Sequence, residues 1–127
     1  MKTKKIMGTA KMHLAGVTFA NRQGKLWALK KADTAYLTLK REPNNEHDPN
    51  AIKVLAHTIT NNKIKVFEIG YVPAEKAKWL APAMDDGKYV RITNFNMTGY
   101  KPLGVEFTLI HELYTVTVKE TATVIAE

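Results

Sequence analysis

The feature that most constrains this chain is an unbroken stretch, REPNNEHDPNAIKV, which runs from Arg41 to Val54. It holds two successive turn-forming groups, Pro-Asn-Asn at 43–45 and Asp-Pro-Asn at 48–50. Residues 51–54 then alternate between apolar and polar side chains, as a strand does. The stretch is too polar to be core and too rich in defined turns to be a linker. It therefore predicts an ordered loop that leads into a strand and presents side chains to a ligand.

The rest of the chain predicts a mainly β domain. Alternating apolar patterns indicate about six strands, at residues 9–14, 36–40, 51–56, 63–71, 88–96 and 105–114. Asn21 is placed to cap a short helix, and Pro73 suits the first position of a second helix, which Pro82 should break into two pieces. Trp27 and Trp79 occupy apolar helical positions and are predicted to be core. Short strands interrupted by two small helices favour a small closed or nearly closed barrel.

Length and composition fit a single domain. The chain has 127 residues, and a hydrophobic content of 45% is enough for one compact core. We assign residues 1–114 to this domain and residues 115–127 to a C-terminal tail that forms an added strand or a homo-oligomer contact. No apolar run approaches the ~20 residues of a membrane span. No apolar stretch of signal-peptide length follows the basic start of the chain, and cysteine is absent. We therefore expect a cytoplasmic protein without a membrane partner.

Charge is distributed unevenly along the chain, whose formal net charge is +7. Through Arg41 there are ten Lys/Arg residues against one acid, Asp33, whereas from Glu42 onward nine bases stand against eleven acids. A basic front half is typical of a domain that binds a polyanion, most often nucleic acid. Lysine-rich surfaces also serve solubility alone, so charge by itself leaves both readings open.

The sequence gives little support for catalysis. Its four histidines, His13, His47, His57 and His111, are scattered without a metal-ligand spacing. There is no Gly-rich phosphate loop before a helix, and no cysteine to act as a nucleophile. We therefore expect a protein that is not an enzyme, with no catalytic residues, no metal and no cofactor.

Four segments together resemble the HIRAN domain family: LAGVTFANRQ at 14–23, REPNNEHDPNAIKV at 41–54, IGYVP at 69–73 and LAPAMDDG at 80–87. The resemblance implies an OB-like β-barrel. Such domains stand at the front of eukaryotic DNA-damage-tolerance helicase-like translocases, and also form stand-alone bacterial or phage proteins. The best-understood members bind single-stranded DNA and capture a free 3′-hydroxyl end. For this chain the resemblance implies a single-stranded DNA 3′ end as ligand, a role in DNA repair or replication-fork processing, and a helicase or nuclease as protein partner.

The resemblance also implies where a nucleotide is held. Phe19 takes the place of an aromatic residue that stacks on a base, and His47 takes the place of a second, often a tyrosine. Thr18 stands where DNA-binding members can carry a longer basic residue, and Arg22 is close enough in sequence to supply the phosphate contact instead. Asp48 is expected to accept a hydrogen bond from the terminal 3′-OH and to disfavour a 3′-phosphate.

Tyr71, Tyr100 and Asn45 complete the implied site. Tyr71 corresponds to a position that contacts the nucleotide, Tyr100 lies near the place of a loop aromatic above the DNA, and Asn45 is a candidate to bond a base edge. Structural roles compete with these. Tyr71 can pack on the helix that follows Pro73, and Asn45 can close the first turn. Asp48 can form an Asx-turn, which is compatible with end recognition because a carboxylate has two oxygens.

Two other functions stay open at this point. The domain can serve as a protein-interaction or assembly module that has kept the fold and lost the ligand, which the departures at Thr18 and His47 favour. It can also bind single-stranded RNA, because no residue identifiably reads a 2′-OH group.

Overall fold

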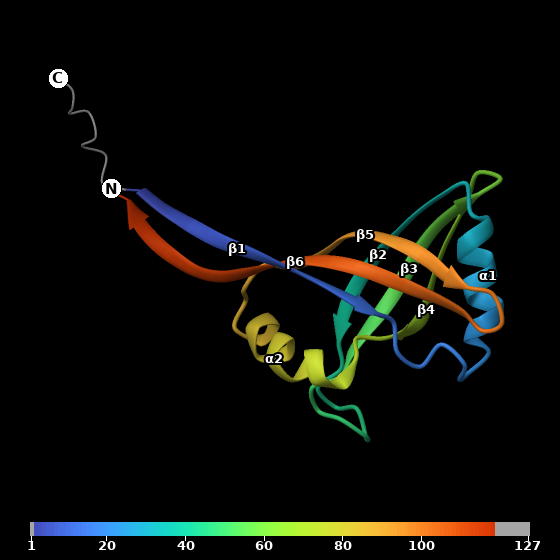
Figure 1. Ribbon diagram of the computed structural model, residues 1–127, viewed down its shortest axis with the longest axis horizontal. Coiled ribbons are helices and arrows are strands. Elements are labelled where there is room, and N and C mark those ends of the chain that lie inside the picture. Colours follow the sequence, from blue (N-terminus) through green and yellow to red (C-terminus); the bar gives the residue numbers. More distant parts are fainter. Residues whose placement is uncertain (1, 119–127) are drawn as a thin grey trace.

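The computed structural model describes residues 2–118 and contains six strands and two helices (Figure 1). In chain order these are β1 (Lys2–His13), α1 (Arg22–Lys31), β2 (Thr34–Arg41), β3 (Ile52–Thr60), β4 (Lys63–Tyr71), α2 (Ala74–Asp85), β5 (Val90–Gly99) and β6 (Leu103–Val118). The mainly β class and the predicted numbers of strands and helices are confirmed for the described residues.

The strands form two antiparallel sheets of three, β1-β6-β5 and β2-β3-β4. One antiparallel bridge, between Ala15 and Tyr71, joins the segment after β1 to the end of β4. At the other seam β5 lies beside β2 without backbone pairing, and side chains such as Leu37 and Phe95 border a hollow of about 270 Å³ there. The predicted barrel is therefore not closed by strand pairing within residues 2–118, because β2 and β5 lie side by side at one of its two seams without pairing.

The core lies between the two sheets and is closed by the helices. β6 buries every second residue, and the side chains at these positions are Leu103, Val105, Phe107 and Leu109. The inner face of β3 does the same in the facing sheet, with Ile52, Val54 and Ala56. This period of two is what a strand with one apolar face produces. The helices add Leu26 and Leu29 from α1, and Ala77, Leu80 and Ala81 from α2.

Three local predictions about the helices were wrong. Pro82 lies inside one continuous α2 instead of breaking it, and its carbonyl still accepts a hydrogen bond from Asp86 N at 3.0 Å, which holds the last turn. Asn21 does precede α1, but its φ of 59° is left-handed and its side chain makes no capping bond. Trp79 is 42% exposed, whereas Trp27 is partly buried against the core. Neither helix is long and apolar enough to cross a membrane.

β1 and β6 extend past the rest of their sheet as a two-stranded ribbon, at the left of Figure 1. Residues 2–6 of β1 pair with residues 114–118 of β6, whereas β5 stops pairing at Val90, opposite His111. Residues 115–118 of the predicted tail thus continue β6. The remaining tail residues, 119–127, lie outside the described part of the chain, so the tail's role as an added strand or oligomer contact stays a prediction.

The seam at Tyr71 generates a prediction about Gly70. A Cβ at Gly70 would overlap the Ala15 carbonyl oxygen and come within 2.8 Å of Leu14 Cγ. We expect Gly70→Ala to lower the free energy of unfolding by about 1–3 kcal/mol, as overpacking does, in urea titrations followed by circular dichroism. Gly24→Ala is the control, because Gly24 lies in α1 with no atom within 4 Å of the added Cβ. It should stabilise by about 0.5–1 kcal/mol. Equal stability of wild type and Gly70→Ala would contradict this account of the seam.

Candidate nucleic-acid interface

The loop between β2 and β3 is held in one shape by its own side chains. Asn45 Oδ1 accepts hydrogen bonds from the backbone N–H of His47 (2.8 Å) and of Asp48 (3.0 Å). Asn45 Nδ2 donates to Glu42 Oε1 at 3.1 Å. The predicted turn role of Asn45 is therefore the one observed, and its amide is engaged inside the loop. At the base of the loop, Glu42 N donates to Ala51 O at 3.0 Å.

Asp48 adopts the predicted Asx-turn. Its Oδ1 accepts a hydrogen bond from Asn50 N at 2.8 Å, and its carbonyl accepts one from Ala51 N at 3.0 Å. The side chain is half-buried. Its second oxygen, Oδ2, has no hydrogen-bond partner in the described part of the chain. The structure thus uses one oxygen for the turn and leaves the other available.

Beneath the loop, five side chains form a closed circuit, which we call the charged ring: Glu42, Lys53, Glu68, Arg22 and Tyr71. Lys53 Nζ lies 2.6 Å from Glu42 Oε2 and 2.8 Å from Glu68 Oε2. Arg22 NH2 donates to Glu68 Oε1 at 3.3 Å, and the Arg22 guanidinium lies over the Tyr71 ring, 5.3 Å from its centroid. Tyr71 OH closes the circuit by donating to Glu42 Oε1 at 2.7 Å.

The charged ring shifts the acidity of its members. Hydrogen bonds from Lys53, Tyr71 and Asn45 lower the pKa of Glu42 to about 2. The Lys53 ammonium likewise lowers the pKa of Glu68 and has its own pKa raised by both carboxylates. Burial, and then the hydrogen bond to Glu42, raise the pKa of the Tyr71 phenol. At neutral pH two cations and two carboxylates therefore balance within the ring.

The sequence analysis missed the ring. Glu42, which the sequence analysis did not single out, bonds three side chains beneath the loop. Lys53 and Glu68 were not singled out at all. Lys53 stands opposite Tyr71 in the β3–β4 pairing, and Glu68 stands opposite Leu55, directly after the register shift between Val54 and Leu55. The pairing register of β2, β3 and β4 places the strand residues of the ring side by side. The sequence of a single strand does not reveal this register.

Arg22 is in a different position from the one expected of a phosphate ligand. The residue is 7% exposed, and its NH1 donates to Gly16 O at 3.0 Å. Its Nε is buried without a hydrogen-bond partner among the described residues. Arg22 thus ties the loop before α1 to β4 and orients the Tyr71 ring. Its guanidinium faces protein groups, so Arg22 positions the site in this structure.

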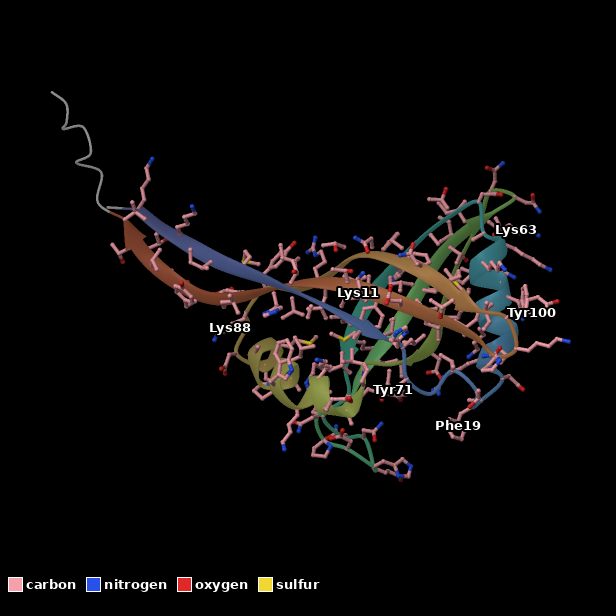
Figure 2. The ribbon with its side chains drawn as sticks, viewed as in Figure 1. Lys11, Phe19, Lys63, Tyr71, Lys88 and Tyr100 are labelled. Carbon is pink, nitrogen blue, oxygen red and sulfur yellow. The ribbon has the colours of Figure 1, made fainter. Side chains whose placement is uncertain are left out.

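The remaining loop residues are exposed. Phe19, in the turn between Ala15 and α1, is 69% exposed, and Thr18 and His47 are also exposed. In the view of Figure 2 Phe19 and Tyr71 both lie toward the lower side of the molecule. Residues 41–47 and Tyr71 border an open hollow of about 520 Å³. The turn that carries Phe19 is joined to Tyr71, because Ala15 pairs with Tyr71 and because Arg22, whose N–H donates to Phe19 O, covers the Tyr71 ring. We call this side of the molecule, with the hollow, Tyr71 and the Phe19 turn, the Phe19 face.

Tyr100 lies apart from that face. Its ring meets Trp27 of α1 edge-on, with centroids 5.4 Å apart, and Lys101 lies over it at 5.7 Å. Figure 2 shows it beside α1, on the side away from Tyr71. Tyr100 is 62% exposed, so it offers a stacking surface, but the structure does not bring it to the charged ring.

No group of three or more His, Asp or Glu side chains within residues 2–118 is arranged to hold a metal ion. The two cations of the charged ring are already bound by carboxylates. What this face offers chemically is an open hollow with His47 and Tyr71 at its border, the Asp48 carboxylate oxygen next along the chain from His47, and a loop backbone that is fixed by hydrogen bonds. This arrangement suits recognition of a hydroxyl-bearing group with a flat ring attached.

Comparison with known proteins gives the following findings. A family model described as the HIRAN domain matches residues 7–109. A crystal structure of a protein from Lactobacillus plantarum is similar, with 21% sequence identity and a TM-score of 0.55. That alignment covers 87% of this chain and 100% of the other, and it concerns the fold alone. The comparison with curated proteins found no match.

The depressed pKa of Glu42 makes the ring testable by pH. The folded-state pKa lies near 2 instead of 4.5, so the ring's stabilisation is present above about pH 4.5 and is lost as the pH falls toward 2. Glu42→Gln keeps the shape but removes the charge. We expect it to lower the free energy of unfolding by about 1–3 kcal/mol at pH 7, with a smaller deficit near pH 2.5. Urea titrations across this pH range measure both.

Glu46→Gln is the matched control for that experiment, because Glu46 lies exposed in the same loop. It should leave stability within about 0.5 kcal/mol of wild type. If Glu42→Gln and Glu46→Gln behave alike at every pH, the ring does not stabilise the fold.

Proposed function

We propose, from the premise that this chain belongs to the HIRAN domain family, that it binds single-stranded DNA through a free 3′-hydroxyl end. The family is known for binding DNA 3′ ends, and its domain is a non-catalytic binding module. Membership confirms the resemblance of the four sequence segments. The residues that bind, the preference for an end and the biological role are our proposals for this chain.

The observation that carries the proposal is the available oxygen of Asp48. A carboxylate repels the phosphates of a DNA backbone, so it is misplaced along a groove that follows the strand. At a terminus it has a use, since Oδ2 can accept a hydrogen bond from the 3′-OH while Oδ1 stays bonded to Asn50 N. A 3′-phosphate in the same place would meet a like charge. Asp48 therefore reads the hydroxyl, and the Asx-turn fixes where it does so.

Flat side chains hold the terminal nucleotides beside that carboxylate. Phe19 is exposed on the same face and stacks on a base, and His47 offers a second, smaller surface. Tyr71 lies at the edge of the hollow with its hydroxyl bonded to Glu42. Arg22 acts indirectly, by orienting Tyr71 and the loop that carries Thr18 and Phe19.

A protein-interaction role is the second candidate, and the β1–β6 ribbon is the observation that favours it. Tyr114 is 57% exposed on this ribbon and Val118 is 43% exposed. Beyond Val90 the ribbon has no third strand among the described residues, so both of its edges are open to another strand. A helicase, a nuclease or a second copy of this chain are the partners we proposed from the sequence. This role is compatible with DNA binding, because the ribbon extends toward the opposite side of the view from Phe19 (Figure 2).

End recognition is tested with Asp48→Asn. Asparagine keeps an oxygen for the Asx-turn and loses the negative charge, so the loop should retain its shape. Fluorescence anisotropy should show wild type preferring a 3′-OH strand over the same strand with a 3′-phosphate by about tenfold or more, as one lost charge-assisted hydrogen bond implies. Asp48→Asn should bind both strands alike, and its affinity for the 3′-OH strand should be lower than that of wild type by up to about tenfold, because the charge-assisted hydrogen bond is lost.

Glu46→Gln again serves as control, because it removes one negative charge from the same loop. It should keep the wild-type preference. Equal wild-type affinity for 3′-OH, 3′-phosphate and end-blocked strands would remove the end-reading role, and absence of binding at low salt would remove DNA as the ligand. An RNA strand of the same sequence in the same titration decides between the two nucleic acids.

Stacking is tested with Phe19→Ala. Loss of one base–aromatic stack is expected to cost about 1–3 kcal/mol, which is roughly tenfold to a hundredfold in Kd. Tyr36→Ala is the control, because Tyr36 is 59% exposed but lies on β2, stacked on His57. It should bind DNA as wild type does. A Kd for Phe19→Ala equal to that of the control would show that Phe19 does not hold a base.

A further inference from the structure

A second cavity lies at the other end of α1 from the Phe19 face. It is a cleft of about 400 Å³ between α1 and the β3–β4 hairpin, and we call it the α1–β4 cleft. The residues that line it are Ala28, Lys31, Thr58, Thr60, Asn61, Lys63, Lys65 and Phe67. Nothing in the proposed end recognition uses it.

The cleft is apolar inside and cationic at its rim. Phe67 and Ala28 supply apolar surface, and the three lysines add their aliphatic stems. Lys63 and Lys65 are exposed and stand opposite Thr60 and Thr58 in the hairpin, so neither has a carboxylate as its cross-strand neighbour.

Lys31, Lys63 and Lys65 form no ion pair with any carboxylate in the described part of the chain. The acid at this end of the molecule is Asp33, and its Oδ2 accepts a hydrogen bond from Asn61 N at 3.0 Å. The carboxyl end of α1 accounts for a lysine at position 31, because cations are stabilised there. It does not account for Lys63 and Lys65, which lie on another element. The rim of the cleft therefore carries three positive charges that no carboxylate in residues 2–118 neutralises, and it is suited to bind an anion.

α1 and β4 connect this cleft to the end-binding face. Arg22 at the start of α1 meets Glu68 and Tyr71 at the end of β4, whereas Lys31 at the end of α1 lines the cleft with Lys63 at the start of β4. Figure 2 shows Lys63 at the opposite end of α1 from Phe19. From Tyr71 back to Lys65 the strand covers roughly 20 Å, at about 3.3 Å per residue. A single DNA strand whose 3′ end is held at Tyr71 thus needs to extend by only a few nucleotides to reach the lysines.

We propose that the α1–β4 cleft binds the backbone phosphates of the same single strand, several nucleotides before its 3′ end. Lys31, Lys63 and Lys65 contact the phosphates, and a sugar or base packs on Phe67. The inference rests on the proposed function for the identity of the ligand. The net charge of the charged ring is zero, and the end-binding face carries a carboxylate. Phosphate binding at the cleft explains how the domain still attracts a polyanion. The end is read at one place, and the strand is held at another.

The test compares strands of two lengths in the full chain. Both carry a free 3′-OH; one has two nucleotides, which is too short to reach the cleft from Tyr71, and the other has about twelve, which lies within the site sizes of a single OB fold. Wild type should bind the longer strand more tightly. The double variant Lys63→Gln/Lys65→Gln should lose about fivefold to tenfold in affinity for the longer strand at 50 mM salt, with two phosphate contacts gone. Its affinity for the shorter strand should stay within about twofold of wild type.

The salt dependence gives an independent readout. Each phosphate contact with a single strand contributes about −0.7 to the slope of log K against log salt, so the double variant should reduce the magnitude of that slope by about 1.4. Lys31→Gln, on the opposite wall, should lower it by about half as much. The control is Lys4→Gln/Lys88→Gln, which removes the same charge from exposed positions on the ribbon and after α2. It should leave length dependence and slope near those of wild type, and thermal melting should show all variants folded.

The outcomes separate this proposal from the one on which it rests. If the cleft variant and the control lower the affinity and slope equally, the lysines act only as diffuse charge and the cleft is not a site. If wild type prefers a 3′-OH but binds both lengths equally, the end-binding function stands and the cleft proposal falls. If wild type binds neither strand, both proposals fall.

Discussion

The ion pairs that Lys53 makes with Glu42 and Glu68 are the interaction on which the rest of the site depends. Lys53 lies on β3, Glu42 just after β2 and Glu68 on β4, so one ammonium connects all three strands of its sheet at their end. Through Glu42 it fixes Asn45 and Tyr71, and through Glu68 it fixes Arg22. An isolated surface pair contributes little, but here each carboxylate has two or more partners and is only partly exposed.

The consequence for function is a division of charge across the molecule. Both cations of the charged ring are paired with the ring's own carboxylates. Asp48, on the Phe19 face, keeps one carboxylate oxygen without a hydrogen bond. Attraction of a nucleic acid must then come from lysines elsewhere, and the α1–β4 cleft supplies a group of them. Separation of the two tasks removes a conflict, because a carboxylate that selects a hydroxyl and cations that attract phosphate weaken each other when they are neighbours.

Local rules in the sequence predicted much of this, and long-range register did not. The Asx-turn of Asp48 and the turn that Asn45 closes follow from side chains that bond the backbone beside them. The ring could not be predicted, because Glu42 and Lys53 meet only through the pairing of β2, β3 and β4. Barrel closure could not be predicted for the same reason. It depends on whether β2 and β5 pair, and these strands are far apart in the sequence.

The most direct test of the account follows the backbone amides of the 42–51 loop by NMR while strands with a 3′-OH or a 3′-phosphate are added. Asn50 N–H is the reporter, since it donates to the carboxylate of Asp48 that we assign to the 3′-OH. The account predicts a large shift of the Asn50 amide with the 3′-OH strand and a much smaller one with the 3′-phosphate strand. Equal shifts with both strands, or shifts confined to other parts of the chain, would contradict it.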